Sequence, residues 1–453
     1  MDYRKPALLV TTLGSFLIPF MGSSVNVALP SIGKEFSMDA ILLSWLTTSY
    51  LLTAAMFLVP FGRLGDIHGR KRLFLYGFVI YTLSSVLSAI APSPLFLIAS
   101  RVLNGIGASM TISTGVAMLI SAYPPEERGK VLGINVAAVY SGLSCGPLFG
   151  GLLTQYLGWR SIFGLNIPLG ALIVILTMWR LKGEWTEAKG EKFDLFGSIL
   201  FSASLMAAMY GFSQLPRIRG ASSILLGVLG IVALIKWELK TESPLFNIDL
   251  IGKNKVFAFS NLAALINYSA TFAVGFLMSL YLQFIKGMNP REAGIILIAQ
   301  PIVQALFSPL AGRLSDRLEP RIVASIGMAM TTLGLLFFSF LSQEATVVFI
   351  VGILMILGFG FALFSSPNTN AVMSSVEKKF YGVASGTLGT MRATGMMLSM
   401  GMVMVIFAIY IGPAQITPPT YPLFVKSVRI GFAIFTILCL AGIFASLSRG
   451  RMR

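Results

Sequence analysis

Two arginines lie inside long apolar runs of the chain, where a charged side chain is costly. Arg101 opens an Arg-Val-Leu-Asn-Gly-Ile-Gly-Ala segment, and Arg392 lies in the run 382–411. Arg101 is roughly 9 Å inside its run, and Asn104 follows on the same helix face. A cation at such depth marks a polar path or a coupling group, unless it reaches the surface or bonds neighbouring carbonyl groups. We therefore treat Arg101, Asn104 and Arg392 as candidates for substrate contact or coupling.

Uncharged polar side chains in the same runs could line such a path. Gln300 and Gln304 share one helix face at a spacing of four residues. A polar group in an apolar medium also bridges neighbouring helices, so lining and bridging both remain open for each residue. The set comprises Asn26, Asn135, Asn261, Asn267, Tyr268, Gln300 and Gln304.

Other chemistry is poorly represented. The chain has one histidine, His68, and two cysteines, Cys145 and Cys439, which lie far apart in apolar runs. This set offers neither a metal site nor a disulfide framework. No glycine-rich loop ends in Lys-Ser or Lys-Thr, so ATP is not the expected energy source. We expect no enzyme activity and no cofactor, and we assign His68 to a solvated loop.

The composition places most of the chain in lipid. Of its 453 residues, 55% are hydrophobic and 11% are charged, with a mean hydropathy of +0.81. Soluble domains carry roughly 25% charged residues. The net charge of +16 does not indicate nucleic-acid binding, because the basic residues are scattered among loops between apolar runs. They favour alternate loops by about three to one, which predicts a plasma-membrane protein with both termini in the cytoplasm.

The apolar runs predict fourteen membrane-spanning helices, and the first is long enough to stay in the membrane. They cover residues 8–29, 41–61, 73–91, 95–119, 131–156, 161–180, 195–214, 221–237, 257–284, 293–311, 322–342, 346–367, 382–411 and 428–448.

A repeated motif divides the chain into three parts. The sequence GRLGD of Gly62–Asp66 recurs as GRLSD in Gly312–Asp316, about 250 residues later. This offset exceeds six helices with ordinary loops and fits six helices plus two, which we place at 195–214 and 221–237. We therefore predict two six-helix bundles related by an axis along the membrane normal, with an insertion between them. The predicted boundaries are 1–182, 183–255 and 256–453.

The first copy continues as GRLGDIHGRKR over Gly62–Arg72, which resembles the signature loop of the major facilitator superfamily. The resemblance implies an all-α membrane fold and transport by alternating access. It also implies that Asp66 caps a helix of the other bundle, where a carboxylate meets unpaired N–H groups, and that Arg70 helps to hold the cytoplasmic side shut. The implied gate residues are Gly62, Asp66, Gly69, Arg70 and Lys71, with Gly312, Arg313 and Asp316 as a degenerate second copy.

A glycine-rich segment, Gly142–Gly151, reads GLSCGPLFGG. Its spacing places Gly142, Gly146 and Gly150 on one face, where a neighbouring helix can approach closely, and Pro147 permits a bend. The pattern is similar to the signature of exporters in the superfamily. With Gly151 it predicts a flexing interface, although a packing role with no bearing on direction remains open.

Three further segments, 26–30, 159–170 and 194–197, resemble the fourteen-helix drug:proton antiporter branch. That branch usually carries an aspartate five residues before the Asn-Val-Ala-Leu-Pro run, and here Met21 occupies the position. No Asp or Glu falls inside any predicted span. Because a buried carboxylate with a raised pKa is the usual proton carrier, proton coupling does not follow from the resemblance.

The sequence therefore predicts an exporter of small lipophilic molecules, neutral or anionic, because two intramembrane cations repel cationic solutes. Proton coupling through water, Arg101 or an acid at a helix end remains open. The alternatives are an uncoupled facilitator or an importer of a small organic anion, and a non-transporting receptor. The expected partners are a small-molecule substrate, the lipid bilayer and, if coupled, protons, but no nucleic acid. The oligomeric state is not determined, and a monomer is compatible with the sequence.

Overall fold

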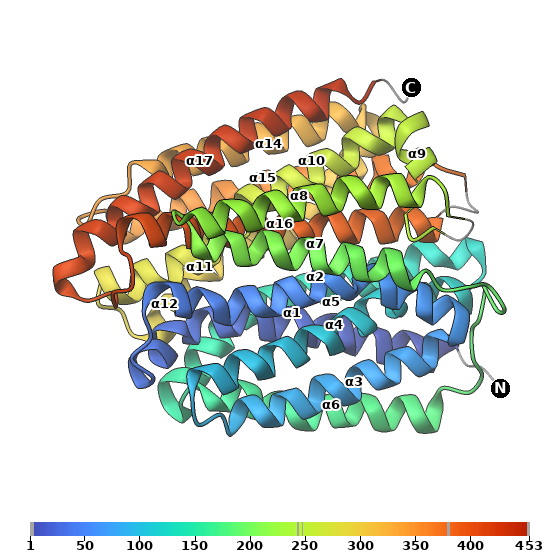
Figure 1. Cartoon of the computed structure of the whole chain (residues 1–453), viewed down its shortest axis with the longest axis horizontal. Coiled ribbons are helices and arrows are strands. Elements are labelled where there is room, and N and C mark those ends of the chain that lie inside the picture. Colours follow the sequence, from blue (N-terminus) through green and yellow to red (C-terminus); the bar gives the residue numbers. More distant parts are fainter. Residues whose placement is uncertain (1–3, 242–243, 247, 378–380, 451–453) are drawn as a thin grey trace.

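The computed structural model describes residues 4–241, 244–246, 248–377 and 381–450. These residues form helices and connecting loops without any strand, and 14 helical segments are long and apolar enough to cross a membrane. The helices run side by side along the long axis, and both ends of the chain lie at one end of the molecule (Figure 1). We call this the terminal end and the opposite one the far end. The predicted fourteen-helix all-α membrane fold is confirmed.

The amino-terminal bundle is built from six spans. Helix α1 packs most extensively against α5, and α4 packs between α2 and α3. Side-chain caps begin two of these helices at the far end: Asp39 Oδ1 accepts from Leu42 N at 2.7 Å, and Ser93 Oγ accepts from Phe96 N at 3.3 Å. Such caps satisfy N–H groups that a helix start leaves unpaired. The helices are α1 (Arg4–Glu35), α2 (Ala40–His68), α3 (Arg70–Ala89), α4 (Pro94–Ala122), α5 (Pro125–Leu157) and α6 (Arg160–Arg180).

The carboxy-terminal bundle contains two interrupted spans. One consists of α10, α11 and a π-helical turn, η1, and the next consists of α12 and α13. A π-helical turn inside a helix often marks a functional position. The elements are α9 (Ile248–Lys253), α10 (Lys255–Thr271), α11 (Ala273–Leu280), η1 (Tyr281–Ile285), α12 (Pro290–Leu297), α13 (Ala299–Arg317), α14 (Pro320–Ser339), α15 (Val347–Ser374), α16 (Tyr381–Tyr410), η3 (Pro418–Thr420) and α17 (Tyr421–Ser448).

The two inserted helices, α7 (Leu195–Gln214) and α8 (Ile218–Glu238), form a hairpin beside the line where α2 meets α16. The hairpin contacts both bundles. Ser202 Oγ donates to the Met56 carbonyl oxygen of α2 at 3.1 Å, and the Phe212 ring lies against Gly401 of α16. It therefore covers the seam between the bundles on one side of the molecule (Figure 1).

Equivalent contacts in the two bundles support the internal repeat. A Cβ placed on Gly107 of α4 would lie 2.7 Å from the Gly77 carbonyl oxygen of α3. A Cβ on Gly360 of α15 would lie 2.8 Å from the Gly327 carbonyl oxygen of α14. Each pair lets two backbones touch, so α3 and α4 correspond to α14 and α15.

Several helices were predicted too short at the terminal end. Helix α2 continues to His68 instead of ending at 61, α5 begins at Pro125 instead of 131, and α15 continues to Ser374 instead of 367. Hydropathy marks the hydrocarbon layer, whereas backbone hydrogen bonds extend a helix into the polar interface. The expected loop 62–72 is consequently helical on both sides of Gly69. The three-part division at 182 and 255 stays a prediction.

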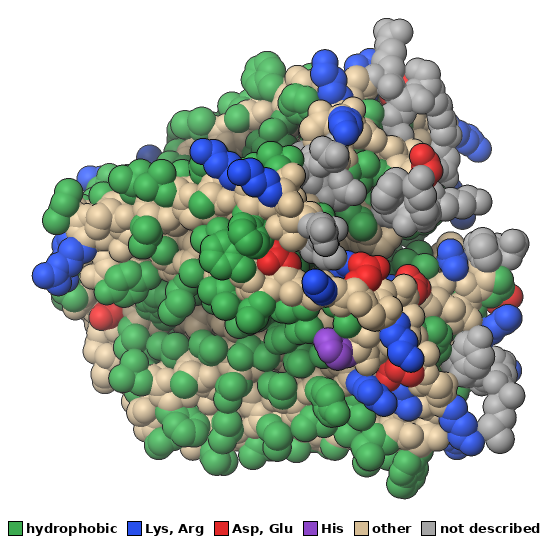
Figure 2. All heavy atoms as spheres, turned by 45° about the vertical axis from the view of Figure 1, so that its right-hand side comes forward, with side chains coloured by type: hydrophobic (Ala, Val, Ile, Leu, Met, Phe, Trp, Pro, Cys, Tyr) green, Lys and Arg blue, Asp and Glu red, His purple; other side chains and the backbone are tan. Residues whose placement is uncertain are grey.

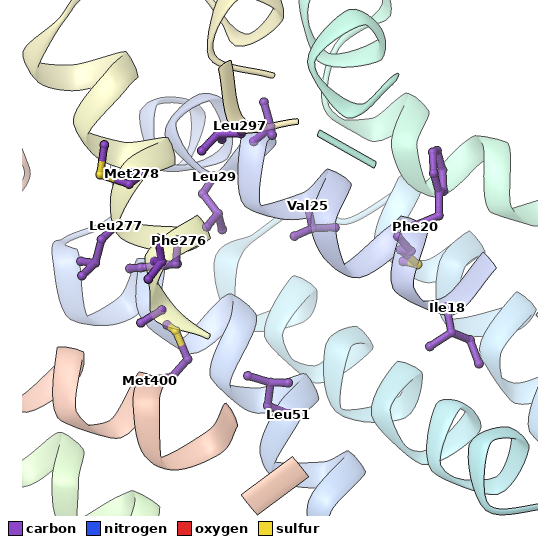
Figure 3. Close-up of a cluster of buried hydrophobic side chains, with 14 of the residues drawn as sticks. Ile18, Phe20, Val25, Leu29, Leu51, Phe276, Leu277, Met278, Leu297 and Met400 are labelled. Carbon is purple, nitrogen blue, oxygen red and sulfur yellow. The ribbon is translucent and has the colours of Figure 1, made fainter. Parts of the chain in front are cut away.

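The apolar core crosses the boundary between the bundles near the far end. Leu29 of α1 lies beside Phe276 of α11 and Leu297 of α12, and all three are almost fully buried (Figure 3). Apolar side chains also cover much of the face shown in Figure 2, whereas most basic and acidic side chains on that face lie near the terminal end. This pattern suits a lipid-facing belt with a polar end.

Candidate functional site

Hydrogen bonds join the two bundles toward the far end of α1. Ser279 Oγ of α11 donates to the Asn26 carbonyl oxygen at 2.7 Å, and Gln283 Nε2 of η1 donates to the Val27 carbonyl oxygen at 2.9 Å. The Asn26 side chain accepts from Thr47 Oγ1 of α2 at 3.3 Å. Asn26, a predicted site residue, therefore lies where α1, α2 and α11 meet.

The loops at the far end continue this contact. Ala40 N donates to the Ala414 carbonyl oxygen at 3.2 Å, and Gln415 Nε2 donates to the Ser37 carbonyl oxygen at 2.9 Å. We define the far-end seam as these two bonds, the bonds of Ser279 and Gln283 to α1, and the α5–α12 contact described in the paragraphs below. The two bundles are in contact at this end.

The glycine-rich segment of α5 presents two different faces. Gly142, Gly146 and Gly150 lie against α1, as their spacing predicted: a Cβ on Gly142 would lie 2.3 Å from the Phe16 carbonyl oxygen. Ser24 Oγ donates to the Gly146 carbonyl oxygen at 2.9 Å. This face packs within the amino-terminal bundle.

The other face of α5 belongs to the seam. A Cβ on Gly151 would lie 2.4 Å from the Pro290 carbonyl oxygen, and a Cβ on Gly294 would lie 2.2 Å from the Pro147 carbonyl oxygen. The backbones of α5 and α12 therefore touch across the two bundles. Gly151 and Pro147 contact the other bundle, whereas Gly142, Gly146 and Gly150 contact α1.

At the terminal end, Gly69 joins α2 to α3 with a φ of +120°. Glycine adopts such a backbone readily, and a Cβ here would also lie 2.5 Å from Glu184 Cδ. The Glu184 carboxylate accepts from the backbone N of Lys71 at 2.7 Å and of Arg72 at 3.2 Å. An acid of the loop after α6 thus caps the start of α3.

Arg70 is buried and forms the centre of a hydrogen-bond network at this end. Its Nε donates to Asp66 Oδ1 at 2.7 Å, and its Nη1 and Nη2 donate to the two oxygens of Glu187 at 2.7 and 3.0 Å. Nη1 also bonds the Ala117 carbonyl oxygen and Ser121 of α4. Among the described residues, Arg70 is the partner of the Asp66 carboxylate, so the predicted cap on the other bundle stays a prediction.

We call residues 181–194 the acidic linker. Its Glu191 pairs with Arg63, and its backbone bonds the motif at Arg70 N and at the Asp66 carbonyl oxygen. Burial raises the pKa of Glu187, but hydrogen bonds from Arg70 and Ser121 and the charge of Arg70 outweigh it, so this pKa lies below its usual value. The sequence analysis missed these acids; their spacing of three and four residues is visible, but the motif that they bind lies more than 100 residues earlier in the chain.

The second motif copy is placed equivalently. Gly62 of α2 packs against Ser113 of α4, and Gly312 of α13 packs against Ser366 of α15. Arg313 is exposed near the end of α13. The side chain of Asp316 lies outside the described part of the chain.

Arg101 is buried and well bonded in the amino-terminal bundle. Its Nε donates to the Leu46 carbonyl oxygen at 3.3 Å, its Nη1 donates to Asn104 Oδ1 at 2.8 Å, and its guanidinium carbon lies 4.5 Å from the centre of the Tyr50 ring. Asn104 Nδ2 in turn donates to Ser84 Oγ at 3.1 Å. These contacts connect α2, α3 and α4.

Met21, at the position of the usual aspartate, is also buried. Its sulfur accepts a hydrogen bond from Tyr81 Oη at 3.0 Å. The position thus retains a hydrogen-bond partner on α3 but has no ionisable group of its own.

Arg392 has fewer partners and lies near the middle of α16. Its Nη2 donates to Thr369 Oγ1 of α15 at 2.6 Å, and its guanidinium carbon lies 5.6 Å from the centre of the Tyr268 ring of α10. Its Nε is buried, and none of the described residues forms a hydrogen bond with it. Tyr140 of α5 reaches this region from the other bundle, with Oη 3.4 Å from Ser365 Oγ.

The remaining predicted residues are less clearly connected. Asn267 is fully buried beside Tyr268, and neither polar atom of its side chain has a partner among the described residues. Gln304 is buried, and its Nε2 has no hydrogen-bond partner among the residues that the structure describes; the Gln300 backbone contacts Gly358 of α15. The structure does not join these three side chains to Arg392.

A further buried cation, Arg449, was not predicted because it follows the last apolar run. It donates to Ser260, Asn368 and Ser446 in a network that joins α10, α15 and α17. Burial and the charge of Arg321 lower its pKa to about 10, while Glu319 opposes the shift. Arg449 therefore stays charged at neutral pH.

Comparisons with known proteins agree with this geometry. Residues 11–237 and 260–451 match the Major Facilitator Superfamily. The multidrug resistance protein Stp of Mycobacterium tuberculosis (strain CDC 1551 / Oshkosh) is 32% identical over 86% of this chain and 73% of its own. The riboflavin transporter RibZ of Clostridioides difficile (strain 630) is 29% identical over 86% of both chains. The cephamycin export protein CmcT of Amycolatopsis lactamdurans is 30% identical over 86% of this chain and 82% of its own.

A crystal structure of a bacterial homologue of the human lysosomal transporter Spinster has the same fold. It superposes with a TM-score of 0.68 at 18% identity and covers 99% of this chain and 97% of its own. With the family match over most of the sequence and relatives named as drug and antibiotic exporters, the chain belongs to the Major Facilitator Superfamily, in its drug-exporter-like branch, and is a transporter rather than an enzyme.

Proposed function

We propose that this protein is a secondary active exporter of small lipophilic compounds, neutral or anionic, in the plasma membrane. The observation that carries the proposal is the far-end seam, where two bundles of a transporter fold meet through hydrogen bonds, glycine contacts and packed apolar side chains of separate helices. Such contacts separate without unfolding either bundle, as alternating access requires. The names of relatives such as Stp and CmcT support export.

The terminal end is the cytoplasmic end in this proposal. The basic residues of the motif and of the loops near both termini support the assignment, since cytoplasmic loops are enriched in Lys and Arg. A cysteine at Lys189 in the acidic linker would then react with an impermeant maleimide only after the cells are opened. Labelling of that cysteine in intact cells would reverse the orientation.

With this orientation, each end of the molecule has a separate role in gating. Asp66, Arg70 and the acidic linker hold the cytoplasmic ends of α2, α3 and α4 as one unit, and the α5–α12 contact at Gly151 closes the outer side. When the seam opens, this unit would move as a rigid body.

Resistance of a drug-sensitive host tests export. Cells that express the intact protein should tolerate some neutral or anionic antibiotics at concentrations that kill the empty host. Accumulation of these compounds should fall in the same cells and recover in the Arg70→Gln variant at equal expression. Equal accumulation in intact-protein and empty cells across the panel would contradict export.

An uncoupled facilitator, or an importer of a small organic anion, is the second candidate. The occupancy of the usual aspartate position by Met21, bonded to Tyr81, favours it. Inside-out vesicles with a pH-sensitive dye separate the two candidates: substrate-evoked proton movement supports the antiporter, and substrate uptake without it supports the facilitator.

A further inference from the structure

The hydrogen-bonding capacity of Arg392 is largely unused. A guanidinium group offers an N–H on every nitrogen, yet the bond from Nη2 to Thr369 is the one hydrogen bond that the described residues provide. Nε is shielded from solvent and has no hydrogen-bond partner in the described part of the chain. Leaving a buried donor of a charged group unpaired costs free energy that a suitable acceptor would recover.

No carboxylate that the structure describes forms an ion pair with Arg392; the ion pairs of these acidic side chains involve other bases. The residue lies about 16 Å along α16 from Tyr381, at a depth where an unpaired cation is costly. An anion bound from outside the chain would supply a counter-charge here.

The guanidinium groups of Arg101 and Arg449 differ from that of Arg392. Arg101 bonds a carbonyl oxygen and an amide oxygen and faces a tyrosine ring closely, and Arg449 bonds three side chains and a carbonyl oxygen. Both are almost fully buried, whereas Arg392 is only half-buried. Arg392 is thus the one of these three that combines unused donors with access.

Groups from both bundles surround this access. Thr369 and Tyr140 are half-buried like Arg392, and Tyr140 brings a phenol from α5 to within 3.4 Å of Ser365 on α15. The Tyr268 ring lies edge-on to Phe361 with centroids 5.3 Å apart. A cation beside hydroxyl groups and aromatic faces suits an anion on a flat apolar body.

We infer that Arg392, Thr369, Tyr140 and Tyr268 form an anion-binding subsite between the bundles, which takes the carboxylate or sulfonate of an aromatic organic anion. The anion accepts from Arg392, the Tyr140 hydroxyl donates to it in place of its present contact, and the aromatic body lies against Tyr268. The inference rests on the proposed transport function for its biological meaning, but binding itself is independent of direction and coupling.

Binding of two matched probes to the purified protein in lipid nanodiscs tests the subsite. Dansylglycine carries a carboxylate, and dansylglycinamide has the same aromatic body without the charge. Fluorescence titration should give at least about tenfold tighter binding of the carboxylate. Arg392→Gln should remove this preference while the affinity for the amide stays unchanged, and Tyr140→Phe should weaken the carboxylate about threefold to tenfold.

Controls separate recognition from folding. Arg429→Gln removes a positive charge at the far end, where Arg429 bonds the Ser339 carbonyl oxygen, and should retain the preference. If the glutamine variant proves unstable, Arg392→Lys replaces it: this variant keeps the charge and should retain part of the preference for the carboxylate probe. Three outcomes would overturn the subsite. The intact protein binds both probes with equal affinity, neither probe saturates the protein below about 1 mM, or Arg392→Gln weakens the binding of both probes equally. If binding fails while resistance persists, only the subsite is wrong; if resistance fails while binding holds, only the exporter assignment is wrong.

Discussion

The arginine side chains inside the spans differ in how many of their donors are used, and this difference separates structural from functional roles. Arg101 contributes to contacts among three helices, so its loss removes the hydrogen bonds to the Leu46 carbonyl oxygen and to Asn104 Oδ1. Arg392 contributes one hydrogen bond. Sequence reasoning treated both residues alike, because the partners come from other helices and leave no trace in the local pattern.

This difference predicts losses of stability of different size for the same substitution at the two arginines. Arg101→Gln should destabilise the protein by about 2–3 kcal/mol, because buried bonds from a charged group are lost, whereas Arg392→Gln should cost about 1 kcal/mol or less. Thermal unfolding in detergent, followed by tryptophan fluorescence, measures the order of the midpoints. Equal midpoints for the two variants would contradict the assigned roles.

Glu187 predicts a pH-dependent contribution to stability. Its pKa is lower in the folded protein than the usual value of 4.5, so the bond to Arg70 stabilises the fold above that value and is lost as the pH falls through the lowered pKa. Glu187→Gln should cost about 1 kcal/mol at pH 7, since the carboxylate is largely exposed. The difference in unfolding midpoint from the intact protein should vanish only on acidification well below pH 4.5. Glu344→Gln, an exposed acid at the far end, should have no effect at either pH.

At the scale of elements, the glycine periodicity predicted close helix approach correctly because it is a property of one helix face. The segment's second face could not be predicted, since Gly151 meets Pro290 of the other bundle. The acidic linker was missed for a related reason: charges in a loop do not specify which buried base they bind. The helix ends were misplaced because hydropathy reports the lipid layer and not the hydrogen bonds that continue beyond it.

The two faces of α5 predict two phenotypes for the same change. Gly146→Ala would place a methyl group 1.8 Å from Ser23 Oγ, so it should disturb α1–α5 packing and lower the thermal stability. Gly151→Ala would instead disturb the seam and favour opening at the far end, with little loss of stability. The matched control is Gly164→Ala on α6, where a Cβ meets open space.

Thiol labelling reads the seam directly. Ser279→Cys, in a chain with Cys145→Ala and Cys439→Ala, places a thiol at a buried position of the seam. An impermeant maleimide added to intact cells should label it several times faster in Gly151→Ala than in the parent or in Gly164→Ala. Unchanged labelling would mean that this contact does not control opening.

At the scale of the whole molecule, the bundles behave as two bodies only if the seam separates in every transport cycle. Ser37 and Gln415 are exposed, lie on loops of opposite bundles and are joined by a hydrogen bond. A short bismaleimide between cysteines at these positions should hold the far end closed. Glu35 and Arg160 form an exposed ion pair within the amino-terminal bundle, so the same reagent between cysteines there should leave the bundles free to move.

We therefore expect cross-linking of the Ser37→Cys/Gln415→Cys protein to reduce efflux of an exported compound to the level of empty cells. The same treatment of the Glu35→Cys/Arg160→Cys protein should leave most efflux intact, because that link joins residues that move together. Both proteins would carry Cys145→Ala and Cys439→Ala, so that the reagent has no other thiol target. The extent of cross-linking is measured by mass spectrometry of the same samples. Efflux that persists when the Ser37–Gln415 link is complete would show that substrates leave without separation of the far-end seam, and would exclude alternating access by this route.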